Sequence, residues 1–308
     1  MPPRLRSYRE TSFWALPQEL RLQVWEFIME TGAPYSGYAS VSRGWQSFFE
    51  RLTFKTLRLH QDDIPNFTKI VKGHRTSFVR HIWLRLELLG YDCPNCEEPE
   101  SEAERKSNNQ IFSVAVYRLF SILGEWEKGV TGGLEIELSA HSRSDWEHHF
   151  KELAYRSTEG ATRPLPGSVR YHDPAHDGGI KRIIEALPNL EHFSYEPWAG
   201  GMFDREIKRW EYDHTYLASK LLQRKRSLKT VSIFQDFNRP LNGQCAARFP
   251  VGKWGPEFAE LSVSLERMYG SFAVDAMDFF AYVDEHVSEE EKVRQTAFVC
   301  RSSRSEHA

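Results

Sequence analysis

The chain has 308 residues, 40% hydrophobic content and a formal net charge of −3, a balance that argues against a nucleic-acid groove. No apolar run approaches the roughly 18 residues needed to span a bilayer, so we expect no membrane segment. Four cysteines in a chain of this length favour a reduced compartment, and the first residues carry no secretory signal, so we expect a cytoplasmic or nuclear protein.

The first expected element is a short helix within "WALPQELRLQVWEF", residues 14–27. Pro17 suits its first turn, because the missing N–H costs nothing there. At about 100° per residue the apolar arc spans roughly 220°, whereas a one-sided helix needs little more than 100°. Its members are Leu20, Leu22, Val24, Trp25, Phe27, Ile28 and Met29. Such a helix needs two partners. Either it is sandwiched inside its own core, or it packs inward on one face and holds another protein with the other.

A loop at "TGAPYSG" leads to a second amphipathic segment. Apolar residues recur there at helical spacing: Tyr38, Val41, Trp45, Phe48, Phe49 and Leu52. The N-terminal fifth of the chain is therefore a compact helical module. A module of fewer than roughly 60 residues buries little surface alone and often leans on a neighbour.

The segments "LPQELRLQVWEFI" and "YASVSRGWQSFFE" resemble an F-box over about residues 14–59, and we place that domain at 12–59. The resemblance implies three helices that dock onto the Skp adaptor of a Skp–cullin–F-box ubiquitin ligase. The adaptor-binding residues that it implies are Leu16, Pro17, Leu20, Ile28, Val41 and Trp45. Trp25 and Met29 are then expected to point inward. The chain departs from the family pattern at "GAPYSG", where an acidic residue and a leucine usually open the second helix, and at Phe54, where many members have tryptophan.

Residues 60–285 are expected to form an α/β domain in which short strands alternate with helices. The spacing apolar-x-x-apolar-x-apolar recurs, and the period of two in a strand places the last two apolar residues of each unit on one face. The five units are Phe54, Leu57, Leu59; Val79, Ile82, Leu84; Leu190, Phe193, Tyr195; Leu228, Val231, Ile233; and Phe258, Leu261, Val263. "GLEIEL" at 133–138 is a further candidate strand, and helices are expected at 111–126 and 183–187.

The recurring unit resembles a leucine-rich repeat, the kind of domain with which F-box proteins often recruit a substrate. The alternative is an ordinary mixed α/β domain, because the units are unevenly separated. Parts of the chain, such as "HIWLRLELLGYDC", are similar to uncharacterised fungal F-box proteins. The predicted fold class is α/β, with an N-terminal three-helix F-box and an irregular leucine-rich-repeat-like strand–helix domain.

The C-terminal residues 286–308 are expected to be a polar, disordered tail without a final strand. "LERMYG" at 265–270 is interpreted as an insertion. We expect these features to leave the last edge of the repeat domain uncovered.

Few residues suggest chemistry. Cys93 and Cys96 have the spacing of half a zinc site, but Cys245 and Cys300 are isolated and no paired histidines complete it. "HSRSDWEHHF" contains His141, Asp145, His148 and His149, which we interpret as a solvated helix face. "GVTGG" at 129–133 lacks the ending of a phosphate loop. The basic run "KLLQRKRSLK" at 220–229 could contact an acidic partner or be the charged end of a helix. We therefore expect no catalytic residue, metal or cofactor.

The sequence thus predicts a substrate-receptor subunit that binds the Skp adaptor and, through it, the cullin and RING subunits, and that holds an unknown target protein with its C-terminal domain. The alternative is an F-box interaction scaffold that acts outside a ubiquitin ligase. No nucleic-acid or membrane partner is expected.

Overall fold

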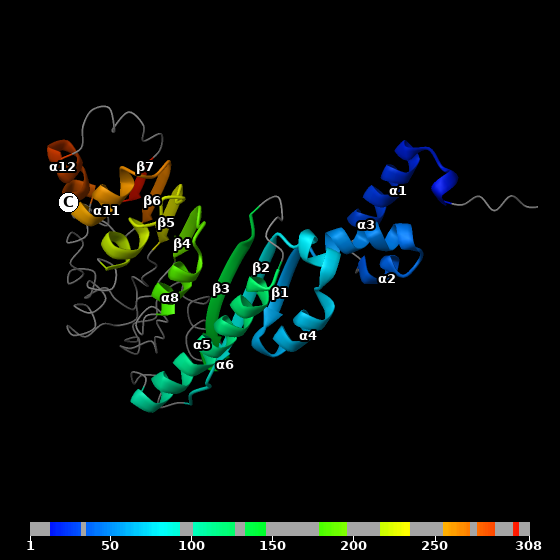
Figure 1. Ribbon diagram of the computed structural model, residues 1–308, viewed down its shortest axis with the longest axis horizontal. Coiled ribbons are helices and arrows are strands. Elements are labelled where there is room, and N and C mark those ends of the chain that lie inside the picture. Colours follow the sequence, from blue (N-terminus) through cyan, green and yellow to red (C-terminus); the bar gives the residue numbers. More distant parts are fainter. Residues whose placement is uncertain are drawn as a thin grey trace, which may run out of the picture. The chain divides into compact units, whose positions relative to one another are not determined.

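A computed structural model of the chain shows a mixed α/β protein, as predicted, with helices at the N-terminus followed by strands and helices (Figure 1). The structure describes residues 13–31, 35–92, 101–126, 133–145, 179–195, 216–234, 255–271, 276–286 and 298–301. Within these segments no helix is long and apolar enough to cross a membrane.

The helices and short helical turns alternate with seven strands among the described residues. The helical elements are η1 (Phe13–Ala15), α1 (Gln18–Glu30), α2 (Tyr35–Ala39), α3 (Arg43–Thr53), η2 (Gln61–Asp63), α4 (Ile64–Ile70), η3 (Gly73–Phe78), α5 (Glu102–Gly124), α6 (Arg143–Asp145), α8 (Gly179–Ala186), the π-helical η6 (Leu217–Leu222), α11 (Gly255–Ser262) and α12 (Ala276–His286). The strands are β1 (Thr56–His60), β2 (His81–Leu88), β3 (Glu135–Ser142), β4 (His192–Tyr195), β5 (Thr230–Phe234), β6 (Arg267–Ser271) and β7 (Phe298–Arg301).

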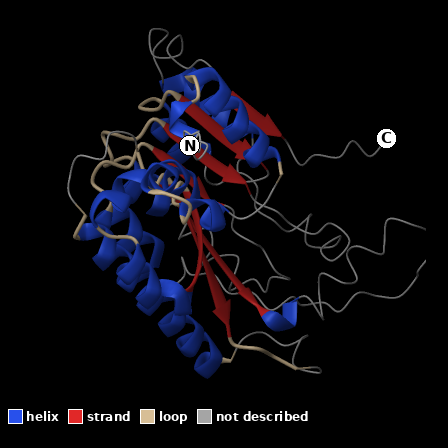
Figure 2. Cartoon of the chain, turned by 90° about the vertical axis from the view of Figure 1, so that its right-hand side faces the viewer, coloured by secondary structure: helices blue, strands red, loops and turns tan. Residues whose placement is uncertain are grey.

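The chain divides into two compact units, residues 1–84 with 122–138 and residues 85–121 with 139–308. A three-stranded sheet has the order β1-β2-β3. Figure 2 shows the strands of the chain in red and the helices in blue. Alternate side chains of β2 are fully buried, as its apolar periodicity requires: Ile82, Leu84 and Leu86. The strands predicted around Leu57 and Ile82 and at "GLEIEL", and the helix predicted at 111–126, are confirmed as β1, β2, β3 and α5.

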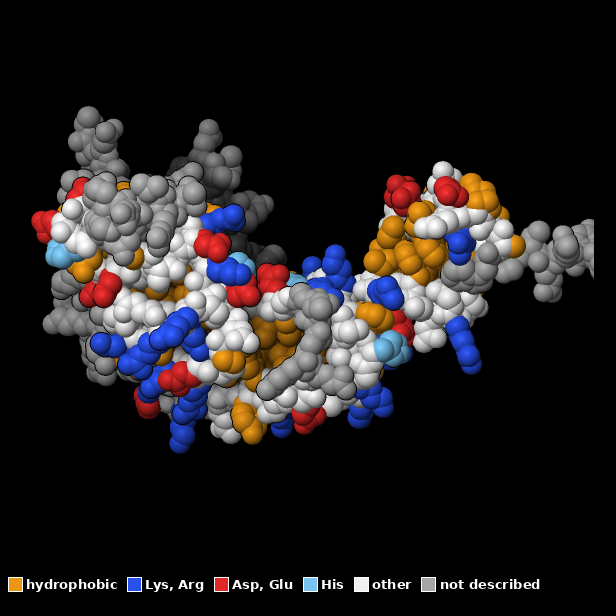
Figure 3. Space-filling model, turned by 45° about the horizontal axis from the view of Figure 1, so that its top comes forward, with side chains coloured by type: hydrophobic (Ala, Val, Ile, Leu, Met, Phe, Trp, Pro, Cys, Tyr) orange, Lys and Arg blue, Asp and Glu red, His pale blue; other side chains and the backbone are white. Residues whose placement is uncertain are grey.

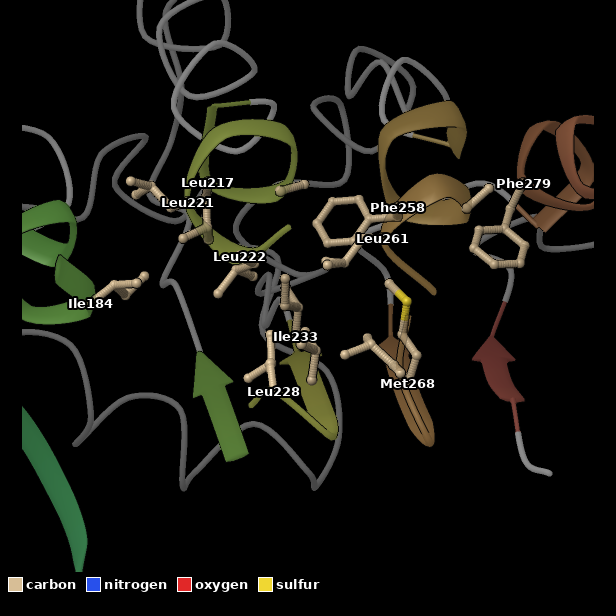
Figure 4. Packing of buried hydrophobic residues seen from close by; sticks show 14 of the residues in the cluster. Ile184, Leu217, Leu221, Leu222, Leu228, Ile233, Phe258, Leu261, Met268 and Phe279 are labelled. Carbon is tan, nitrogen blue, oxygen red and sulfur yellow. The ribbon is translucent and has the colours of Figure 1, made fainter. Parts of the chain in front are cut away.

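The second unit contains a parallel sheet in the sequential order β4-β5-β6-β7. Its strands are separated along the chain by η6, α11 and α12, so strand and helix alternate as predicted. The helices and one face of the sheet enclose a continuous apolar core (Figure 4). In that view Leu222 and Phe258 from the helices point toward Ile233 and Met268 from the strands. Val231 and Ile233 are 0% and 1% exposed, so the apolar face of β5 is fully covered.

One hydrogen-bond arrangement recurs where strands begin. The Lys55 carbonyl accepts from the N–H groups of Arg80 and His81, and the Glu191 carbonyl accepts from Lys229 and Thr230. The Lys229 carbonyl in turn accepts from Glu266 and Arg267. Each of these carbonyls belongs to the residue that comes immediately after the first apolar residue of a recurring unit. Those first apolar residues are Phe54, Leu190 and Leu228. The sequence spacing therefore corresponds to a repeated backbone geometry.

The prediction for the fifth unit is wrong. Phe258, Leu261 and Val263 belong to or directly follow α11, which begins at Gly255. The strand is instead β6, within "LERMYG", the segment interpreted as an insertion. Leu265, Met268 and Gly270 have the spacing of the other units, and all three are buried. The spacing of the fifth unit is thus present, seven residues later than predicted.

The expectation that the chain lacks a final strand is also wrong. β7 lies within the predicted disordered tail, residues 286–308, and pairs in parallel with β6. The physical reason is register: Met268 aligns with Phe298, and Ser271 with Arg301, so four residues in extended conformation complete the ladder. The outer edge of β6 is therefore paired, and β7 stands last in the order of the described strands of this sheet.

Candidate functional site

Helix α1 carries a row of exposed apolar side chains. Leu20, Val24 and Phe27 follow one another at helical spacing and are 45%, 37% and 68% exposed. Leu16, one turn before Leu20, is also exposed, as is Val41 in the turn between α2 and α3. We call Leu16, Leu20, Val24 and Phe27 the apolar row. Figure 3 shows apolar side chains gathered on the part of the chain that carries α1–α3. Exposed large apolar groups concentrated on one helix face are typical of protein-binding surfaces.

The opposite face of α1 packs into a cluster of aromatic rings. The Trp25 ring stacks on Phe48 at a centroid distance of 3.9 Å and an interplanar angle of 13°. The Phe13 ring lies 5.6 Å from Trp25 and 4.9 Å from Trp45, and the fully buried Phe49 ring lies 5.6 Å from Trp45. These contacts fix α1 on α3. Only one side of α1 therefore faces its own core among the described residues, and the apolar row is on the other side.

The start of α3 explains why Val41, Ser42 and Trp45 occur together. Ser42 has extended backbone angles and caps α3, because its hydroxyl accepts a hydrogen bond from the Trp45 N–H at 3.4 Å. The cap sets the position of the first helical turn, which directs the Trp45 ring toward Phe13 and Phe49. Val41, immediately before the cap, is 62% exposed.

The six residues predicted to contact the adaptor divide into two groups. Leu16, Pro17, Leu20 and Val41 are exposed. Ile28 is buried and Trp45 is half-buried in the aromatic cluster, so both stabilise the helical module from within. Trp25 and Met29 are half-buried, which agrees with the expectation that they point inward. The predicted set did not include Val24 and Phe27, although their spacing from Leu20 places them on the same face.

A buried carboxylate anchors α3 to the rest of the first unit. Glu50 Oε1 lies 2.6 Å from Arg75 Nη2 and also accepts a hydrogen bond from Gln46 at 2.9 Å. Glu50 Oε2 lies 3.4 Å from His74 Nε2. The hydrogen bond from Arg75 holds the pKa of the Glu50 carboxyl below its ordinary value, against the opposing effect of burial. A charged, fully paired carboxylate at this position keeps α3, and so the apolar row, on a rigid support.

The residues considered as metal ligands lie mostly outside the described residues. The candidate ligands outside the described segments are Cys93, Cys96, His148 and His149. Of "GVTGG" at 129–133, only the last glycine is described. His141 is half-buried in β3. In the described segments no group of three His, Cys, Asp or Glu side chains could hold a metal ion.

Comparison with known proteins finds a match over the C-terminal part of the chain. The model of a family of unknown function, DUF6546, matches residues 223–305. The matched segment includes β5, α11, β6, α12 and β7, and does not include the helical module. No curated protein and no solved structure matches the chain.

Proposed function

We propose that the chain is a substrate-receptor subunit of a Skp–cullin–F-box ubiquitin ligase. Its helical module, α1–α3, binds the Skp adaptor, and its parallel-sheet domain holds a target protein. The observation that carries the proposal is the apolar row on α1, exposed on one side of a helix whose other side is packed on aromatic rings. A groove on another protein that accepts an amphipathic helix is the partner that such a face requires.

The contact residues follow from exposure. The proposed adaptor contacts keep four residues that the F-box resemblance implies: Leu16, Pro17, Leu20 and Val41. They also include Val24 and Phe27, which are exposed on the same face of α1. Phe27 is the most exposed residue of the row and supplies the largest apolar surface, so it is the expected anchor. Ile28 and Trp45 shape the module without touching the partner.

The mechanism needs no catalytic residue in this chain. Transfer of ubiquitin belongs to the enzymes that the ligase brings together. Holding the target near the loaded conjugating enzyme makes an intermolecular transfer nearly intramolecular, and effective concentrations in the millimolar range are typical of short tethers. The cullin and RING subunits are partners through the adaptor only, and the compartment is the cytoplasm or the nucleus.

Co-expression of the full chain with the Skp adaptor tests the proposal. We expect a stable complex for the wild type and its loss in the double variant Leu20→Glu with Phe27→Glu, because two charges would have to be buried in an apolar groove. The matched control is Val114→Glu with Tyr117→Glu, which places the same charges on exposed apolar positions of α5. The control should bind like the wild type.

The outcomes separate the candidate functions. Retained binding in the Leu20/Phe27 variant would refute the assignment of the contact surface. Failure of the wild type to bind the adaptor would favour the scaffold outside a ligase. Unchanged denaturation midpoints in both variants would show that any loss of binding is not a loss of fold.

A further inference from the structure

A cluster of exposed cations lies on the second unit. The described residues 179–195 and 216–234 contain seven Lys or Arg side chains and two Glu side chains. This excess is local, since the whole chain has a net charge of −3. We call five of the exposed side chains the cationic surface: Lys181, Arg182, Lys220, Arg224 and Arg226. Figure 3 shows Lys and Arg side chains gathered on this unit.

Contacts within the unit bring these residues together from two elements. Helix α8, which carries Lys181 and Arg182, packs against η6, which carries Lys220. The Lys225 ammonium donates a hydrogen bond of 3.0 Å to the Leu187 carbonyl and so ties the turn after η6 to the end of α8. The Lys181 ammonium lies 5.7 Å from the centroid of the Tyr216 ring. The pKa of Lys181 is raised by its hydrogen bond with Tyr216, and the charge of Arg224 acts in the opposite direction, as expected of a near neighbour.

Within the described residues of this unit, the two nearby carboxylates compensate only a small part of the positive charge. Glu191 pairs with Lys229 at 2.6 Å, and Glu185 lies 4.0 Å from Lys181. Among the described segments, Arg182, Lys220, Arg224 and Arg226 make no ion pair. Like charges held close together without counter-charges repel one another and destabilise the free protein. An anionic partner would remove that repulsion.

The helix dipole does not account for the whole cluster. Cations suit a helix C-terminus, which would explain basic residues in the turn after η6. Lys181 and Arg182, however, lie in the first half of α8, near its positive end, where a cation is unfavourable. Lys181 is offset in part by its pair with Glu185, four residues further along α8. For Arg182 no ion pair within the described segments offers such compensation.

We propose that the cationic surface binds an acidic segment of a partner protein, rich in Asp and Glu. Three of its five members are arginines, whose planar guanidinium groups bind carboxylates in pairs of parallel hydrogen bonds. A short acidic peptide can contact the cationic surface alone, without reaching the rest of this chain, whose net charge is negative. A nucleic acid would extend past the patch and meet the acidic remainder of the chain. That this partner is the ubiquitination target rests on the proposed function; the binding itself does not.

Fluorescence anisotropy with a labelled 12-residue Asp/Glu-rich peptide and the full chain tests the inference. We expect binding at low salt that weakens as salt screens the charges. The variant Arg224→Glu with Arg226→Glu should bind at least roughly tenfold more weakly, since two attractive contacts become repulsive. The matched control is Lys69→Glu with Lys72→Glu, which makes the same change of net charge at exposed positions of the first unit and should bind like the wild type.

Three results would overturn the inference: no binding of the peptide by the wild type, equal loss in the control, or tighter binding of a single-stranded oligonucleotide than of the peptide. The measurement uses no adaptor. Peptide binding without adaptor binding would therefore refute the proposed function alone, and adaptor binding without peptide binding would refute this inference alone.

Discussion

The helical module and the parallel-sheet domain both contain periodic apolar residues, but these residues are buried in the sheet domain and exposed on α1 of the helical module. In the sheet domain the apolar faces of β5 and α11 meet, and Val231 and Phe258 are both fully buried. In the helical module the apolar row of α1 stays partly uncovered among the described residues, and Phe27 is 68% exposed. Periodicity alone would assign both sets to a core. Their burial separates a structural face from an exposed face, which we propose binds a partner.

The difference also concerns charge. The surface of the helical module that we assign to binding is apolar, whereas the proposed binding surface of the sheet domain is cationic. An apolar face suits a permanent partner, because its burial supplies most of the binding free energy. A charged face suits a partner that is captured quickly and selected by its own charge. The two surfaces thus fit an adaptor and a target respectively.

The largest expected effect comes from truncating a buried ring. Phe258→Ala removes a fully buried side chain from the core of the sheet domain and should lower the free energy of unfolding by about 3–5 kcal/mol. Phe27→Ala is the matched control, since the same truncation at an exposed position should change the free energy of unfolding by less than about 0.5 kcal/mol. Urea denaturation followed by fluorescence measures both. Equal losses would mean that the Phe27 ring is part of a core, and the comparison between the two regions would fail.

A smaller effect is expected at the carboxylate that supports α3. Glu50→Gln should cost about 2–3 kcal/mol, because the Arg75 guanidinium would lose a charged partner in a buried site. Glu26→Gln, on the exposed side of α1, should cost almost nothing. Denaturation midpoints at neutral pH measure the difference.

The contribution of Glu50 should depend on pH in one direction. Its pKa in the folded protein is below the ordinary value of 4.5, so the stabilisation is complete above pH 4.5 and is lost as the pH falls through the folded-state pKa. The wild type and the Glu50→Gln variant should therefore converge in stability as the solution is acidified below pH 4.5. A difference that stayed constant across this range would contradict the role of the charged pair.

The sequence predicted most of the sheet strands because each has two inward apolar residues at a spacing of two. It failed at β6, where the second inward position is Gly270, a residue without a side chain to signal burial. The prediction instead used Phe258 and Leu261, whose spacing of three also fits a helix. Pro256 in the first turn, followed by Ala259 and Glu260, favours a helix there. Short apolar runs carry this ambiguity in general.

The candidate binding surface was only partly predicted, because sequence spacing was again ambiguous. Helical spacing identified the arc that contains Leu20, Val24 and Phe27, but it could not show which half of that arc faces inward. That half is set by the stacking of Trp25 on Phe48, a contact between residues of different helices. Ile28 lies on the inner side of that boundary and Phe27 on the outer side, although they are adjacent in the sequence.

Hydrogen exchange of the full chain, with and without the Skp adaptor, tests the central claim most directly. We expect the adaptor to slow exchange in α1, residues 18–30, and in the turn around Val41, while exchange in β5, residues 230–234, stays unchanged. This result would place the adaptor on the exposed apolar row. Slower exchange in β5 with no change in α1 would contradict the account, because the binding face would then lie on the sheet domain.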